Sequence, residues 1–152
     1  MQRVILSLVF CLLKLNPIFS QTISIAGEWK LLEMNTDRLF INFQTDSIYL
    51  FDKDDQEKYS TNELKHKLIQ DFALFSQYTI RFERDSTYTI DFMGQIVKGF
   101  YKFNPELSQI SIQESGNTVK SDTLKLTSKG LMEHDMSDDY EKKIMTFKRV
   151  IN

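Results

Sequence analysis

Apolar and polar side chains alternate with a period of two through most of the chain after Ile25, and this alternation constrains the fold more than any other feature. Tyr78, Ile80 and Phe82 alternate with polar neighbours in this way. The same pattern recurs in four later segments: residues 88–92, 97–103, 110–112 and 124–126. It is typical of antiparallel strands that bury one face, and turn-forming residues separate the segments. We therefore predict an all-β domain whose strands close into a barrel or pack as a sandwich.

One segment in the first half of the chain departs from this period. Ser60-Thr61-Asn62-Glu63 matches a capping box, in which Ser60 accepts a hydrogen bond from the helix backbone and Glu63 returns one. Apolar residues then recur at helical spacing: Leu64, Leu68, Phe72 and Phe75. The pattern predicts one amphipathic helix near residues 60–76, inserted into the β domain with its apolar stripe against the barrel. We expect this helix to act as a lid or a side brace.

Residues 1–20 have the organisation of a signal peptide. Arg3 gives a positive start, and an apolar run from Val4 to Leu13 follows. The run is too short to cross a bilayer, which takes about 20 apolar residues, but it suits the apolar core of a signal peptide. We predict cleavage after Ser20 and export to the periplasm, the cell envelope or the medium. A buried N-terminal strand or helix is the alternative.

Residues 21–152 would then form the mature domain. The single cysteine of the chain, Cys11, falls in the leader, and the bulky Val9 and Phe10 before it argue against a lipid anchor. After the leader, the sequence contains no second apolar stretch of the length that a membrane-spanning helix needs. The formal net charge of the 152 residues is −2, which argues against a nucleic-acid binder because such proteins need a basic face.

Residues near the two ends of the mature chain carry a family resemblance. Gly27-Glu28-Trp29 opens the first expected strand, and Arg149 lies in the last. Together with Phe-x-x-Asp-Ser-x-Tyr segments at 43–49 and 82–88, they resemble the small lipocalin-like domains of exported bacterial proteins. The resemblance implies an antiparallel up-and-down barrel of about 8–10 strands, with Arg149 over the ring of Trp29 at a closed end. Gly27 would let the entering chain approach that end closely, and all three residues would be structural.

A lipocalin-like barrel also implies candidate residues for its inner lining. Aromatic side chains in phase with the buried face are the candidates: Phe43, Tyr49, Phe82, Tyr88 and Tyr101. These rings would line a pocket for a small apolar or amphipathic ligand if the barrel holds a cavity. Small eight-stranded barrels can also be filled by their own side chains. Both expectations remain open from the sequence.

Other residue types that often carry chemistry do not form a recognisable site in the sequence. His66 and His134 lie 68 residues apart, so we predict two solvated histidines and no metal site. The segment from Asp52 to Glu63 has partial calcium-loop spacing, but Glu57 stands where that loop needs glycine, so we predict a solvated acidic loop. The sequence has no Gly-x-Ser-x-Gly or phosphate-binding glycine motif, and its carboxylates lie on polar faces or in turns. We therefore expect neither an enzyme nor a cofactor.

These observations favour an exported, non-enzymatic, lipocalin-like protein that binds a small apolar or amphipathic molecule in its barrel. The alternative is a protein-interaction or structural module of the cell envelope with a solid barrel interior and an unidentified protein partner. A third and weaker interpretation is a hydrolase or isomerase with an unrecognised pair of carboxylates. The volume of the barrel interior separates the first two, because a ligand needs a cavity of roughly 300 Å³ or more.

Overall fold

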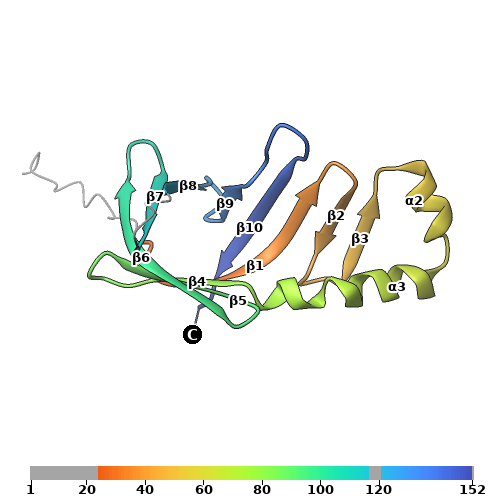
Figure 1. Ribbon diagram of the computed structural model, residues 1–152, viewed down its shortest axis with the longest axis horizontal. Coiled ribbons are helices and arrows are strands. Elements are labelled where there is room, and N and C mark those ends of the chain that lie inside the picture. The colour runs from red at the N-terminus through yellow and green to blue at the C-terminus, as the bar shows by residue number, and fades with distance from the viewer. Residues whose placement is uncertain (1–23, 117–120, 152) are drawn as a thin grey trace, which may run out of the picture.

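The computed structural model describes residues 24–116 and 121–151. The predicted signal peptide over residues 1–20, with Cys11 and the cleavage point after Ser20, lies outside the described residues. Within them the chain forms ten antiparallel strands, two α-helices and one short 3-10 helix (Figure 1). The strands are β1 (Gly27–Thr36), β2 (Leu39–Asn42), β3 (Ser47–Leu50), β4 (Thr79–Phe82), β5 (Thr87–Phe92), β6 (Gln95–Asn104), β7 (Gln109–Glu114), β8 (Ser121–Leu126), β9 (Met132–Asp135) and β10 (Lys143–Arg149).

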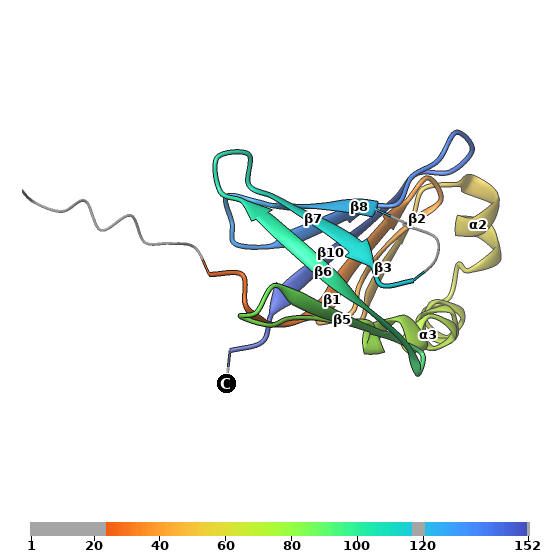
Figure 2. The same cartoon turned by 60° about the vertical axis from the view of Figure 1, so that its left-hand side comes forward.

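Eight of the strands close into a barrel. From β4 to β10 each strand pairs with the next along the chain, and β1 closes the circle by pairing with β10 on one side and β4 on the other. The predicted antiparallel up-and-down barrel is therefore confirmed. In Figure 2, β5, β6 and β7 lie on the near side of this barrel, while the helices stand apart from it at the right.

The strands β2 and β3 do not belong to the barrel, because β1 is shared between two neighbours. Its first half pairs with β4, at Gly27–Lys30, whereas residues Glu33–Asn35 pair with β2. The register against β10 shifts between Leu31 and Glu33, so a bulge separates the two halves. Such bulges bend a strand and increase its twist. The β2–β3 hairpin consequently extends the sheet outward to one side, as Figure 1 shows.

The segment between β3 and β4 contains two helices and a 3-10 turn where one helix was predicted. Helix α2 (Lys53–Lys58) replaces the predicted acidic loop, because the side chain of Asp52 caps it by accepting from Asp54 N and Asp55 N. Helix α3 (Asn62–Asp71) and the 3-10 helix η1 (Ala73–Gln77) follow. The predicted capping box is wrong by one residue, because Thr61 is the N-cap and its hydroxyl accepts from Leu64 N.

The core lies inside the barrel and follows the alternation in the sequence. On β7, Ile110 and Ile112 are buried while the residues between and beside them are exposed. The largest fully buried side chains are Phe82, Phe147, Ile41, Ile80, Ile110, Leu124 and Met132, of which only Ile41 lies outside the eight barrel strands. The predicted period of two therefore identifies the buried face correctly. Across residues 24–116 and 121–151, none of the helices has the length and apolarity needed to span a membrane.

Candidate functional site

The two ends of the barrel differ in how they use their polar groups. We call the end that holds Gly27 and Arg149 the closed end, because the entering chain packs across it and Ile25 is buried there in the core cluster with Trp29. We call the end that holds Thr36 and Lys143 the open end. Two pockets with apolar lining residues lie there, and a third pocket, lined by Gly27, Arg81 and Arg149 among others, lies at the closed end.

At the closed end, Trp29 and Arg149 hold the entering chain. The two residues are opposite each other on β1 and β10. Trp29 is 3% exposed, and its Nε1 donates to the carbonyl oxygen of Ile25 at 2.9 Å. The guanidinium of Arg149 donates to the carbonyl oxygens of Ser24, at 3.1 Å, and of Ala26. Because these hydrogen bonds fix the entering chain against the barrel, both residues have a structural role.

The predicted stacking of Arg149 on the indole ring is not what the structure has. Within the described residues no cation–π contact joins Arg149 to Trp29. The guanidinium turns instead to two backbone carbonyls, which are stronger acceptors for a charged donor than a ring face. Gly27 makes room for it: its φ is +128°, and an added Cβ would lie 3.2 Å from Nε of Arg149. The close neighbour of Gly27 is thus the guanidinium of Arg149, and the predicted approach of the entering chain to the barrel end stays a prediction.

Three of the five predicted lining residues lie inside the barrel, where they pack on one another. The rings of Phe82 and Tyr101 meet edge-on with centroids 4.9 Å apart, and the ring of Tyr88 is 6.4 Å from that of Phe82. The hydroxyl of Tyr101 donates to the carbonyl oxygen of Glu83 at 2.7 Å. This part of the interior is filled by its own side chains. Tyr88 also lines a pocket at the open end.

The other two predicted lining residues belong to the β2–β3 hairpin. Phe43 follows β2 and packs half-buried against the core, while Tyr49 on β3 is 70% exposed. Their predicted place on the inner face of the barrel is wrong, because the hairpin leaves the barrel where β1 divides its pairing between β2 and β4. The alternation of apolar and polar residues does not by itself show which strands belong to the barrel and which extend beyond it.

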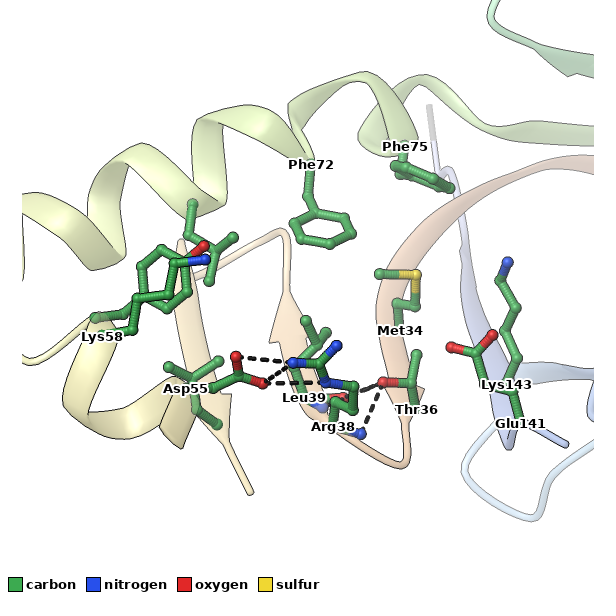
Figure 3. Close-up of a pocket in the computed structure, with 13 residues that line it drawn as sticks. Met34, Thr36, Arg38, Leu39, Asp55, Lys58, Phe72, Phe75, Glu141 and Lys143 are labelled. Atoms are coloured by element: carbon green, nitrogen blue, oxygen red, sulfur yellow. Dashed lines mark hydrogen bonds and ion pairs between the residues drawn. The ribbon is translucent and has the colours of Figure 1, made fainter. Parts of the chain in front are cut away.

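The first pocket of the open end, which we call the insertion cleft, has a volume of about 350 Å³. It lies between the inserted segment of β2, β3 and the helices on one side and β1 and the start of β10 on the other (Figure 3). Its lining residues are Met34, Thr36, Arg38, Leu39, Leu50, Asp55, Lys58, Tyr59, Leu68, Phe72, Phe75, Glu141 and Lys143. None of the five aromatic residues predicted to line the barrel is among them.

The inner wall of the insertion cleft is apolar. In Figure 3, Phe72 and Phe75 project from the helical segment toward the side where Met34 and Leu39 lie. The rings of Phe72 and Phe75 are 5.8 Å apart, and Phe75 also packs on Phe92 of the barrel at 5.4 Å. Phe72 and Phe75, the last two residues of the predicted apolar stripe, thus form a wall of the cleft. Phe75 also connects the helical segment to the barrel.

Charged groups surround this apolar wall. Arg38 makes a two-pronged ion pair with Asp55, with nitrogen–oxygen distances from 2.7 to 3.1 Å. Lys58 lies at the opposite side of the cleft from Lys143 in Figure 3. Neither lysine forms a salt bridge with any residue in the described ranges. The rim therefore offers two ammonium groups that the protein itself does not neutralise by direct pairing.

The second pocket of the open end, which we call the mouth pocket, has a volume of about 470 Å³. It lies between strands β5, β6 and β7 and strands β8 and β9, with part of the β9–β10 turn at its edge. Its lining residues are Tyr88, Ile90, Val97, Ile112, Glu114, Ser121, Asp122, His134, Asp135, Met136 and Ser137. Polar and apolar side chains are mixed in this lining.

His134 is the buried polar residue of the mouth pocket. It is 4% exposed, so the predicted solvated histidine is wrong, whereas His66 on α3 is exposed as predicted. Its Nε2 lies 2.5 Å from Oδ2 of Asp122, and its Nδ1 is buried without a partner in the described part of the chain. The sequence did carry a signal for this burial, because His134 is in phase with Met132 on β9, just as Asp122 is with Leu124 on β8.

The carboxylates of the mouth pocket affect two tyrosines in the barrel. Burial, together with the negative charge of Asp122, raises the pKa of Tyr78 to about 12. Burial also raises the pKa of Tyr88, with further contributions from Glu114 and Asp122. Both phenols are therefore neutral at physiological pH, because burial and nearby negative charge disfavour the phenolate form. No group of three His, Cys, Asp or Glu residues in residues 24–116 and 121–151 is arranged to hold a metal ion.

Comparison with known proteins gives a structural likeness and no family. No protein-family model matches the chain, and no curated protein matches it. A crystal structure of a DUF4847 family protein from Bacteroides vulgatus ATCC 8482 is similar, with a TM-score of 0.51 and 10% sequence identity over 86% of this chain and 96% of that chain. At this identity the likeness concerns the fold alone, and it agrees with the closed barrel described above.

Proposed function

We propose that this chain is a non-enzymatic, lipocalin-like barrel protein, exported by means of residues 1–20, that binds a small amphipathic molecule with an anionic head group in the insertion cleft. The observation that carries the proposal is the apolar wall of this cleft beside two rim lysines, Lys58 and Lys143, that form no salt bridge within the described residues. We therefore expect the ligand at the edge of the barrel instead of among the aromatic side chains of its interior.

The shape and chemistry of the cleft suit a molecule with an apolar tail. Its volume of about 350 Å³ falls within the usual range of small-molecule sites, about 300–1,000 Å³. The tail would lie against Met34, Leu39, Leu68 and the two phenylalanines, Phe72 and Phe75. Each methylene group that leaves water contributes about 0.8 kcal/mol. Affinity should therefore rise about fourfold for each added methylene until the cleft is full.

The charges of the rim favour an anionic head group. Arg38 is already held by Asp55, which leaves Lys58 and Lys143 as the cations that a ligand can reach. A carboxylate, sulfate or phosphate could pair with either ammonium group, because lysine binds such anions as a point charge. Glu141 on the same rim adds repulsion against an anion on its side. The head group is therefore expected close to one of the two lysines.

Calorimetric titration of the purified protein with decanoate tests this proposal. Decanol shares the apolar tail and serves as the control for the head group. We expect saturable binding of decanoate that is stronger than binding of decanol, and affinity that grows from octanoate to decanoate. Equal affinity for decanoate and decanol, or no saturable binding of decanoate, would contradict the proposal.

A pair of matched double variants separates the rim lysines from general charge. Replacing Lys58→Gln and Lys143→Gln together should weaken decanoate binding about tenfold, since each exposed ion pair contributes up to about 1 kcal/mol. Replacing Lys98→Gln and Lys102→Gln together removes the same charge from the exposed face of β6, where both lysines lie. This control should leave the affinity for decanoate unchanged.

Export is the second part of the proposal and has its own test. The positive start and apolar run of residues 1–20 support it. Mass spectrometry of the protein recovered from its native compartment should find Gln21 as the first residue. Recovery of a chain that still begins at Met1 would argue against cleavage and favour the alternative of a retained N-terminal segment.

A further inference from the structure

The mouth pocket differs from the insertion cleft in the sign of its charge. Three carboxylates line it, from Glu114, Asp122 and Asp135. Among the described residues of its lining there is no lysine or arginine. The wall between these carboxylates is apolar, formed by Ile90, Val97 and Ile112 among others. A ligand for this pocket must therefore differ in charge from a ligand for the insertion cleft.

His134 gives a second and independent indication of a binding site. The side chain is buried in the pocket wall, and its Nε2 lies 2.5 Å from Oδ2 of Asp122. The other ring nitrogen, Nδ1, has no partner in the part of the chain that the structure describes. A buried polar atom without a partner destabilises a fold, and a leucine at this position would avoid that loss. Packing alone therefore does not explain the histidine, and the contact of its Nε2 with Asp122 gives it a role in holding that carboxylate in the pocket lining.

We propose that the mouth pocket is a second binding site, specific for a small organic cation of the primary alkylammonium class. The ammonium group would lie between the carboxylates of Asp122 and Glu114, and the short alkyl chain would lie against Ile90, Val97 and Ile112. This site is separate from the insertion cleft, so the proposal does not depend on the function proposed above.

The surroundings favour an alkylammonium ion over a metal ion or a neutral molecule. An ammonium group donates three hydrogen bonds, and carboxylate oxygens and the Tyr88 hydroxyl can accept them. A metal ion would need a group of at least three ligands, and residues 24–116 and 121–151 contain no such group. Burial is the main cause of the raised pKa values of Tyr78 and Tyr88, and the negative charge of Asp122 adds to both. The same field that opposes an anionic phenolate attracts a cation.

Titration with hexylammonium, followed by the chemical shifts of backbone amides, tests the proposal on the full protein. Hexanol and hexanoate are the controls for the head group. We expect hexylammonium to bind at the mouth pocket at least about tenfold more tightly than either control. The shifted amides should belong to Ile112, Asp122 and His134. Equal binding of hexylammonium and hexanol, or shifts confined to other parts of the barrel, would overturn the proposal.

Isosteric variants make the test specific to the pocket. Asp122→Asn keeps a hydrogen-bonding group for His134 but removes the charge, and Glu114→Gln removes the charge of an exposed side chain. Each should weaken hexylammonium binding about tenfold. Glu133→Gln, on the opposite face of β9 from His134, is the matched control and should change nothing. If Asp122→Asn fails to fold, Glu114→Gln decides, and unchanged affinity in that variant overturns the proposal.

Comparison of the two titrations keeps the two proposals apart. Loss of decanoate binding in the Lys58 and Lys143 double variant, with hexylammonium binding intact, would show two independent sites. Binding of decanoate without binding of hexylammonium leaves the insertion cleft as a site and overturns the second one. Mutual displacement of the two probes would mean one shared site and would also contradict the second proposal.

Discussion

The closed and open ends of the same barrel use polar side chains in opposite ways. At the closed end, the indole of Trp29 and the guanidinium of Arg149 donate to carbonyl oxygens of the entering chain. At the open end, Nδ1 of His134 has no partner within the described residues, and Lys58 and Lys143 form no salt bridge there. Both pockets discussed above lie at this second end.

This difference separates stability from recognition. Polar groups that bond to the protein contribute to folding, whereas solvated charged groups such as Lys58 and Lys143 can pair with a ligand without breaking a bond to the protein. Substitutions at the closed end should therefore lower the free energy of unfolding. Substitutions of comparable size at the open end should change binding and leave stability nearly intact.

The largest effect is expected for Trp29→Ala at the closed end. The substitution removes a buried aromatic ring and the hydrogen bond to the carbonyl of Ile25. Replacing a buried Phe or Trp by Ala typically costs about 3–5 kcal/mol. Urea unfolding followed by circular dichroism should show a loss of this size. A loss below about 1 kcal/mol would mean that the closed end is not a centre of stability.

A pH-dependent effect is expected from Tyr78, whose pKa is raised from 10.0 to about 12 in the folded protein. Between these two pH values the folded state holds a proton that the unfolded state has lost, so stability falls as pH rises through this window. The loss should reach about 3 kcal/mol above the window, because one pKa unit corresponds to about 1.4 kcal/mol. Below pH 10 the group contributes no pH dependence.

The variant Tyr78→Phe isolates this contribution from the other groups that titrate at high pH. The difference in unfolding free energy between the wild type and Tyr78→Phe should be constant below pH 10 and should move in favour of the variant toward pH 12. Parallel curves for the two proteins across this window would contradict the burial of the phenol next to Asp122.

A smaller loss is expected for Gly27→Ala at the closed end. The backbone of Gly27 has a φ of +128°, which side-chain-bearing residues rarely adopt, and the new Cβ would press on Arg149. Strain of this kind costs about 1–3 kcal/mol. Thermal unfolding should show a lower midpoint than wild type. Gly116→Ala, where an added Cβ meets nothing within 4 Å and no positive φ is involved, is the control and should unfold like wild type.

The smallest effect is expected for His134→Leu at the open end, although this residue is as buried as Trp29. The leucine removes the unpaired Nδ1, and Asp122 stays hydrated because its side chain is 49% exposed. The free energy of unfolding should change by less than about 1 kcal/mol in either direction. A loss of the size expected for Trp29→Ala would erase the contrast between the two ends.

Much of the fold could be predicted from the sequence because its signals are local. The period of two along β4 to β8 located the buried face. The helical spacing located Phe72 and Phe75, which pack on the core, whereas Leu68 lines the insertion cleft and Leu64 is exposed. Helix α2 was missed because its six residues have no apolar period, and only the cap at Asp52 marks it.

The candidate sites depend on how distant strands pair with one another, and a local sequence pattern does not encode that pairing. The bulge near Leu31 and the division of β1 between two neighbours send Tyr49 away from the barrel and create the insertion cleft. The mouth pocket requires Asp122 and His134 to face each other across β8 and β9. Asp122 lies two residues from the buried Leu124, and His134 lies two residues from the buried Met132. This spacing was the sequence signal that both residues face the interior of the barrel.

The central claim is that the open end of the barrel is its binding end, and amide chemical shifts during a decanoate titration test it most directly. The account predicts saturable shifts at Met34, Leu39, Phe72 and Lys143 around the insertion cleft. It also predicts unchanged shifts at Trp29 and Arg149 of the closed end. Shifts centred on the closed end, or no saturable shift anywhere in the barrel, would contradict it.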